Sequence, residues 1–181
     1  MTLSALGEIA EEVRSELGSV DIFIPALGNA SSILGPARVF GSETKVIAFE
    51  SFQAAVGYEH LHPGEYSRLY GINPGTLSRH RLPGTSYQGM DFMPHTRLAF
   101  EDGRVFEMFL VSDKKMDEEY QEKTGREVPA DLPRWDAIAM PGYGHSTRAG
   151  LAVALKIAAR EEVENKTIVI VAYDHANRYD S

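Results

Sequence analysis

The sequence predicts an α/β fold, built as an open, mostly parallel, three-layer αβα sheet. Three apolar runs support this prediction, at residues 20–26, 46–49 and 167–173. Each run is nearly continuous rather than alternating, which is typical of strands buried on both faces of a parallel sheet. Helical periodicity precedes the first run and separates the runs, as in right-handed βαβ units. The last run, TIVIVAY, is apolar and rich in β-branched residues, so we expect it in the middle of the sheet.

Composition limits the class of protein. The 181 residues suit a single domain, residues 1–181, and the 43% hydrophobic and 24% charged residues are ordinary for a globular chain. No apolar run is long enough to span a bilayer, and the first residues do not form a signal peptide. The absence of cysteine excludes disulfides and thiolate chemistry, and the net charge of −8 argues against a nucleic-acid partner. We therefore expect a cytoplasmic protein with neither nucleic-acid nor membrane partners.

A loop of small residues follows the first apolar run and precedes a helix. A helix N-terminus in this position directs unpaired N–H groups and a positive dipole end at the loop, where a phosphate or carboxylate can bind. A tight connection between a strand and a helix uses the same small residues, so both interpretations stay open at this point. The candidate binding residues are Gly28, Asn29, Ala30, Ser31 and Ser32.

Residues 51–96 show neither helical nor strand periodicity and are rich in proline and glycine, so we expect a loop-rich insert. The spacing of its histidines does not define a metal site, and we interpret His60, His62, His80 and His95 as surface residues.

Residues 97–111 resemble a β-hairpin turning at an Asp-Gly pair. A helix capped by Ser112 or Asp113 follows.

The C-terminal part brings a carboxylate to the same place as the small-residue loop. A helix rich in alanine begins near residues 145–147 and is expected to pack closely on the sheet. The run at 167–173 then leads into Asp174 and His175. Ligands of open parallel sheets bind at the carboxyl ends of the strands, where the first run also ends. The sequence therefore predicts a site that combines an anion-binding loop with Asp174.

The order of these motifs resembles the C-terminal half of the cysteine synthase group, within the tryptophan synthase β-like class of pyridoxal phosphate enzymes. The resemblance covers residues 20–38, 46–50, 142–158 and 166–181, with a weaker match at 89–94. Residues 28–32 stand where these enzymes hold the cofactor phosphate. The resemblance implies pyridoxal phosphate bound without a covalent link, its phosphate on residues 28–32 and its ring nitrogen facing Asp174.

Three departures from the family qualify that implication. Ala30 and Ser31 replace glycines, and Asp174 stands where a serine or threonine is usual. The family's N-terminal half, which carries the Schiff-base lysine, has no counterpart, and no lysine here lies in a similar motif. The resemblance thus implies a cofactor-binding half with no catalytic residue of its own. Its expected partners are a second copy or a separately encoded lysine-bearing half, with a small amino acid as substrate. The six lysines are Lys45, Lys114, Lys115, Lys123, Lys156 and Lys166.

Three functions follow as hypotheses. The first is one half of an enzyme of amino-acid metabolism that catalyses β-elimination or β-replacement and is inactive alone. The second is a non-catalytic module that binds a phosphate-bearing ligand or regulates another protein. The third is an unrelated α/β enzyme that uses His145, Asp174 or His175 on a phosphorylated substrate.

Overall fold

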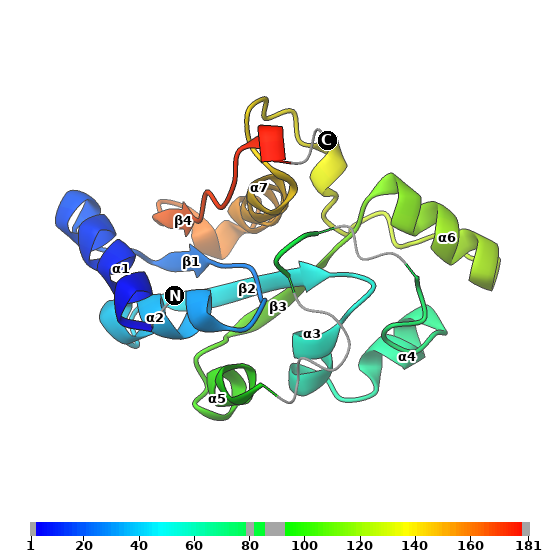
Figure 1. Ribbon diagram of the computed structural model, residues 1–181, viewed down its shortest axis with the longest axis horizontal. Helices are drawn as coiled ribbons and strands as arrows, with labels where there is room; N and C mark the ends of the chain where they lie inside the picture. The colour runs from blue at the N-terminus through cyan, green and yellow to red at the C-terminus, as the bar shows by residue number, and fades with distance from the viewer. Residues whose placement is uncertain (1–2, 79–81, 86–92, 179–181) are drawn as a thin grey trace.

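A wholly parallel sheet of four strands forms the centre of the molecule (Figure 1). The computed structural model describes residues 3–78, 82–85 and 93–178. The strand order is β3-β2-β1-β4, and each neighbouring pair runs parallel. This confirms the predicted α/β class with an open parallel sheet. The strands are β1 (Ile22–Ile24), β2 (Lys45–Ser51), β3 (Glu107–Val111) and β4 (Ile168–Ile170).

Helices cover both faces of the sheet, which confirms the three-layer arrangement. On one face α1 and α2 pack together and cover Phe23 and Val46. On the other face α7 covers Ile24 and Phe49. Alternate residues of a strand point to opposite faces, so each short strand contributes to both cores. The helices are α1 (Leu3–Leu17), α2 (Ser31–Phe40), α3 (Val56–Leu61), α4 (Glu65–Tyr70), α5 (Pro94–Glu101), α6 (Lys114–Thr124) and α7 (His145–Ala158), with short 3₁₀ turns η2 (Trp135–Ala137), η3 (Glu161–Val163) and η4 (Ala176–Arg178).

The predicted hairpin at residues 97–111 is wrong. Helix α5 occupies the place of its first strand, and β3 pairs parallel to β2 from Ile47↔Glu107 onwards. Pro94 starts the helix, where its missing N–H costs nothing. Gly103 has φ 61° and ends the helix, with its N–H donating to the carbonyl of Phe100. The Asp-Gly pair therefore ends a helix instead of turning a hairpin, because both structures need a residue that tolerates positive φ.

The segment after β2 is more ordered than a loop-rich insert. It contains α3 and α4, and buried Glu50 accepts hydrogen bonds from the N–H groups of Val56 and Tyr58, both at 2.8 Å. An aromatic cluster fixes this part of the chain to α6. Its members are Phe52, Tyr66, Tyr70 and Tyr120, with ring centroids 4.8–5.6 Å apart. The treatment of residues 1–181 as one domain with an insert stays a prediction.

The histidines of this segment lie on the surface where they are described. His60 stacks on Phe100 with ring centroids 5.0 Å apart, and His62 lies 3.4 Å from a carboxylate oxygen of Glu65. His95 is also exposed. His80 and most of the segment 89–94 fall outside the described residues. Among the residues that are described, no group of three His, Cys, Asp or Glu side chains is arranged to hold a metal ion.

The prediction that the strand at 167–173 lies mid-sheet is wrong. β4 is at one edge of the described sheet and pairs with β1 alone (Figure 1). All three of its residues are only partly buried. The sequence pattern of a central strand thus occurs at an edge of the described sheet. None of the described helices has the length and apolar character needed to cross a membrane.

The close packing of α7 on the sheet yields a prediction. A Cβ atom added to Gly150 would lie 3.4 Å from the ring of Phe49 and 3.8 Å from Cβ of Ile170, which is ordinary contact. We expect Gly150→Ala to stabilise the chain by about 0.5–1 kcal/mol, because alanine favours the helix. Gly150→Leu should destabilise it by roughly 1–3 kcal/mol through overpacking. Urea unfolding measures both, and equal stability of the two variants would contradict this packing.

Candidate active site

The carboxyl ends of β1 and β4 bring the two predicted loops to one edge of the sheet. The strands are adjacent and parallel, with Ile24 opposite Ile170 in the last registered pair. Gly28 and Asp174 each lie four residues beyond that pair. Neighbouring strands are about 4.8 Å apart, so loops that leave them at the same level start close together. The small-residue loop and the turn carrying Asp174 therefore leave the sheet at the same level of two adjacent strands.

Tyr173 joins these two loops directly. Its hydroxyl oxygen accepts a hydrogen bond of 2.7 Å from the N–H of Ala26. The side chain of Ser32 also hydrogen-bonds this hydroxyl, and Ser32 Oγ donates to the carbonyl of Ala26 at 3.0 Å. Burial raises the pKa of the Tyr173 hydroxyl to about 12, so it stays protonated at neutral pH. The end of β4 is thus attached to the start of the small-residue loop.

The small-residue loop presents hydrogen-bond donors at the start of α2. Ala30, fully buried, adopts the left-handed conformation with φ 63° just before the helix. Asn29 accepts hydrogen bonds through Oδ1 from the N–H of Ser31 at 3.1 Å and from its hydroxyl at 2.6 Å. Within the described part of the chain, no hydrogen-bond partner occupies the N–H groups of Gly28, Asn29, Ala30 and Ser32. Four backbone donors at the positive end of a helix dipole form a site suited to an anion.

Gly28 allows another segment to approach this loop. A Cβ atom at position 28 would lie 2.4 Å from the carbonyl oxygen of Gly84, a distance that no side chain can occupy. Ser146 Oγ in turn donates to the carbonyl of Pro83 at 2.9 Å. The segment 82–85 therefore lies between the small-residue loop and the start of α7. Glycine is needed at position 28 for this contact, whatever ligand the loop binds.

The loop before α7 fixes the backbone on either side of Asp174. The N–H of Tyr173 donates to Thr147 Oγ1 at 2.9 Å. The N–H of Gly144 donates to the carbonyl of Asp174 at 2.7 Å, and the N–H of Ala176 donates to Gly142 at 3.1 Å. These hydrogen bonds hold the turn that carries Asp174 in one conformation.

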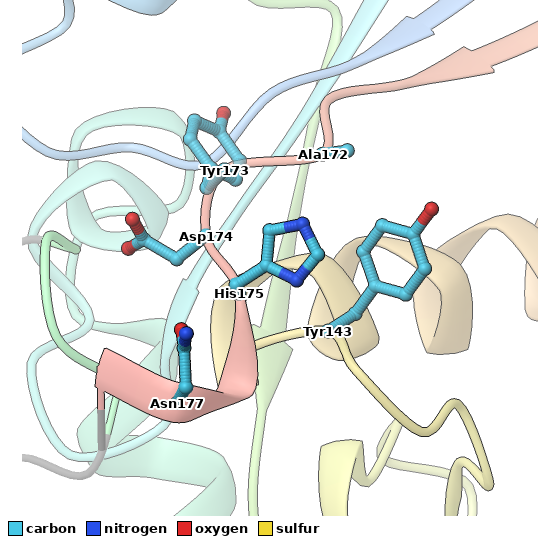
Figure 2. A pocket seen from close by; sticks show the side chains of 6 residues that line it. All are labelled: Tyr143, Ala172, Tyr173, Asp174, His175 and Asn177. Atoms are coloured by element: carbon cyan, nitrogen blue, oxygen red, sulfur yellow. The ribbon is translucent and has the colours of Figure 1, made fainter.

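A cavity of about 350 Å³ lies beside this turn (Figure 2). Figure 2 shows the ring of His175 directed toward Tyr143 and the carboxylate of Asp174 directed to the other side of the chain. The rings of Tyr143 and His175 stack with centroids 5.9 Å apart. The volume is in the range of small-ligand sites. The cavity is lined by Tyr143, Ala172, Tyr173, Asp174, His175 and Asn177.

The structure places some of the predicted site residues in the cavity and leaves others outside it. Asp174 and His175 line the cavity, whereas the residues of the small-residue loop do not; Tyr173 connects the two. His145 lies outside the cavity lining and stacks on Trp135 with centroids 3.9 Å apart. Sequence reasoning missed the bridging hydroxyl of Tyr173 and the acceptor on Thr147. The available signal was a tyrosine at the end of an apolar run, because a buried hydroxyl needs a hydrogen-bond partner.

All six lysines are exposed, and none lines the cavity. Lys45 lies with its ammonium 4.6 Å from the ring centroid of Phe106, and Lys166 pairs with Asp21 at 2.9 Å. Both lie at the amino ends of their strands, away from the cavity. A lysine that forms a covalent link to a carbonyl needs a desolvated position. None of these six has one.

The bridge made by Tyr173 can be tested by removing one oxygen atom. Tyr173→Phe leaves the buried N–H of Ala26 without its acceptor, and we expect a loss of about 1–3 kcal/mol of stability. Tyr143→Phe is the matched control, because the Tyr143 side chain is 37% exposed and should change stability by less than about 0.5 kcal/mol. Urea unfolding measures both variants. Similar values for the two would show that the bridge does not stabilise the loops.

Comparison with known proteins supports the fold. The chain matches no protein-family model and no curated protein sequence. Among solved structures it is similar to a cysteine synthase from Entamoeba histolytica, with TM-score 0.64, 24% identity, and coverage of 98% of this chain and 44% of that one. It is also similar to a hydrogen sulfide-producing enzyme solved with an α-aminoacrylate intermediate, with TM-score 0.57, 18% identity, and coverage of 96% and 43%. The chain thus spans less than half the length of either structure. The resemblance to the cysteine synthase group is confirmed as a resemblance of fold.

Proposed function

We propose that this chain is the cofactor-binding half of a pyridoxal phosphate-dependent enzyme of amino-acid metabolism, with a reaction of the β-elimination or β-replacement type. The observation that supports this most directly is the pairing of a donor-rich loop with a carboxylate on adjacent parallel strands. The similarity in fold to a cysteine synthase and to a hydrogen sulfide-producing enzyme points to the same chemistry. The two other hypotheses, a regulatory module and an enzyme acting on a phosphorylated substrate, have no comparable support.

The residues present fit the two ends of this cofactor. The N–H groups of Gly28, Asn29, Ala30 and Ser32 have no hydrogen-bond partner among the residues that the structure describes. They suit a phosphate, which needs several donors and a positive dipole end. Asp174 offers a carboxylate in the turn that follows the neighbouring strand β4. The ring nitrogen of the cofactor would make a charge-assisted hydrogen bond with this carboxylate. When bound, pyridoxal phosphate supplies an electron sink for carbanions formed on an amino acid.

The rest of the site has positioning roles in this proposal. Tyr173 holds the start of the small-residue loop against the end of β4, so that this loop and Asp174 keep a fixed separation. Thr147 and Gly144 hold the backbone of Tyr173 and Asp174. An ionised carboxylate at position 174 favours a protonated ring nitrogen more strongly than a serine or threonine would. The chain therefore binds and polarises the cofactor.

The covalent part of the chemistry must come from elsewhere. The six lysines are exposed and lie off the cavity, so we infer that another polypeptide segment supplies the lysine and the substrate carboxylate site. That segment would belong to a second copy or to a separately encoded lysine-bearing half. Alone, the chain should not turn over a small amino acid that carries a leaving group on its β-carbon. With no cysteine in the chain, a cytoplasmic location is part of the same proposal.

Cofactor binding to the isolated chain tests the proposal. We expect pyridoxal phosphate to bind with a dissociation constant on the order of 0.1 mM or weaker, because few contacts must offset the lost freedom of the ligand. Asp174→Ala should weaken binding by about tenfold, the worth of one charged hydrogen bond. Asp102→Ala, which changes an exposed carboxylate after α5, should leave affinity unchanged. Absorbance titration of the cofactor measures all three proteins.

Two further results would contradict parts of the proposal. Inorganic phosphate should compete with the cofactor, and a lack of competition would exclude the loop at 28–32 as the phosphate site. Borohydride reduction followed by mass spectrometry should label no lysine stoichiometrically. Complete labelling of one specific lysine would show that the chain carries its own covalent anchor.

A further inference from the structure

We propose that two copies of this chain pair through their β4 strands, forming one continuous antiparallel junction between two parallel sheets. The observation behind this is the conflict between the sequence of β4 and its position. Ile168, Val169 and Ile170 form part of a run typical of a central strand, yet β4 lies at the edge of the described sheet and is partly exposed. A flat apolar edge strand is a template for pairing with another strand. In Figure 1 no strand is drawn beyond β4.

The backbone of β4 offers a defined set of hydrogen bonds at this edge. The carbonyl of Thr167 accepts from the N–H of Ile22, so Thr167 faces β1. Neighbouring residues of a strand direct their backbone groups to opposite sides, so Val169 also faces β1 while Ile168 and Ile170 face outward. Both outward residues present an N–H and a carbonyl, and the described residues supply no partner for them.

This edge is complementary to itself. A two-fold axis at Val169 places Ile168 opposite Ile170 of the second copy, and Ile170 opposite its Ile168. Each of these pairs can exchange both N–H···O bonds, which is the narrow pair of an antiparallel ladder. A second copy therefore satisfies every outward backbone group of β4 with no change in the strand itself. Such an interface is isologous and closed, as in most homodimers.

The side chains beside β4 favour the same occupant. An apolar groove of about 190 Å³ runs between α1 and β4, and Ile9 on its rim is 41% exposed. The two-fold axis brings the α1 helix of each copy to this groove on the same face of the joined sheet. The apolar residues of the two grooves would then cover each other, as edge pairing alone rarely holds a dimer. The groove is lined mainly by Ile9, Val13, Phe23, Phe40, Val169 and Val171.

Charges at the ends of the strand set its direction. Residues 168–173 carry no charged side chain, while Lys166 precedes them and Asp174 follows them. In the antiparallel register Lys166 of one copy lies opposite Ala172 of the other, two residues from Asp174. Lys166 is held by Asp21 of its own chain at 2.9 Å, so the antiparallel register keeps the like charges of the two copies apart without forming a new ion pair. A parallel arrangement would set like charges together.

The mass of the full chain in solution tests this proposal. Light scattering after gel filtration should give twice the 20.0 kDa of one chain, with dissociation on dilution. Ile168→Pro removes an outward N–H and keeps the hydrogen bonds to β1, so it should give a monomer with the sheet intact. Ile168→Val, which keeps the N–H and nearly the same shape, should remain a dimer. Circular dichroism confirms that each variant is folded.

A second variant keeps the test decisive if Ile168→Pro fails to fold. Ile9→Lys places a charge at the exposed rim of the groove without touching the strand, and it should also give a monomer. A wild-type chain that stays monomeric at high concentration would overturn the proposal. A dimer that survives both variants would show that another surface pairs. A different polypeptide that binds the β4 edge in place of a second copy would also count against it.

Discussion

The parallel pairing of β1 with β4 is the constraint on which the candidate site depends. Because both strands end at the same edge, the loop of small residues and the turn carrying Asp174 leave the sheet side by side. The hydrogen bond between Tyr173 and the N–H of Ala26 then fixes one loop against the other. A site made of two loops needs such a connection, since loops are the most mobile parts of a fold. The backbone donors of the small-residue loop and the turn carrying Asp174 are therefore held by the same few contacts.

The sequence predicted those parts of the fold that depend on local pattern. Continuous apolar runs located β1, β2 and β4, and the small residues of α7 predicted its close approach to the sheet, now seen at Gly150. The sheet order could not be predicted, because an apolar run indicates what the strand can bury and not which neighbours it has. The failed hairpin has a similar origin. Positive φ at Gly103 suits a hairpin and a helix end alike, and only the following parallel pairing decides between them.

In the candidate site, too, the features that depend on local sequence pattern could be predicted and those that depend on distant contacts could not. The small-residue loop and Asp174 could be proposed from their place after apolar runs. The hydrogen bond from the N–H of Ala26 to the Tyr173 hydroxyl could not be predicted. The two residues are 147 positions apart, and no sequence motif links them. Ala30 illustrates a local departure. Its buried methyl group and its positive φ occur together, at a position where glycine would relieve the backbone but lose contact with the core.

The open edge of the described sheet occurs in a chain that is shorter than the solved structures it resembles. The chain matches less than half of each solved structure with this fold, and its sheet nevertheless has cores on both faces. Such a unit can fold with the small-residue loop in place and still leave one strand edge of the described sheet bare. The proposed cofactor site, at the carboxyl ends of β1 and β4, and the proposed pairing surface, along the side of β4, are then separate parts of the molecule.

The central claim is that the start of α2 binds the phosphate of a ligand. Amide NMR of the full chain during titration with inorganic phosphate tests it without the cofactor. We expect the largest shifts, with saturation, at Gly28, Asn29, Ala30 and Ser32, because the described residues leave their N–H groups without an acceptor. Shifts confined to exposed lysine and arginine residues, with these four amides unchanged, would contradict it.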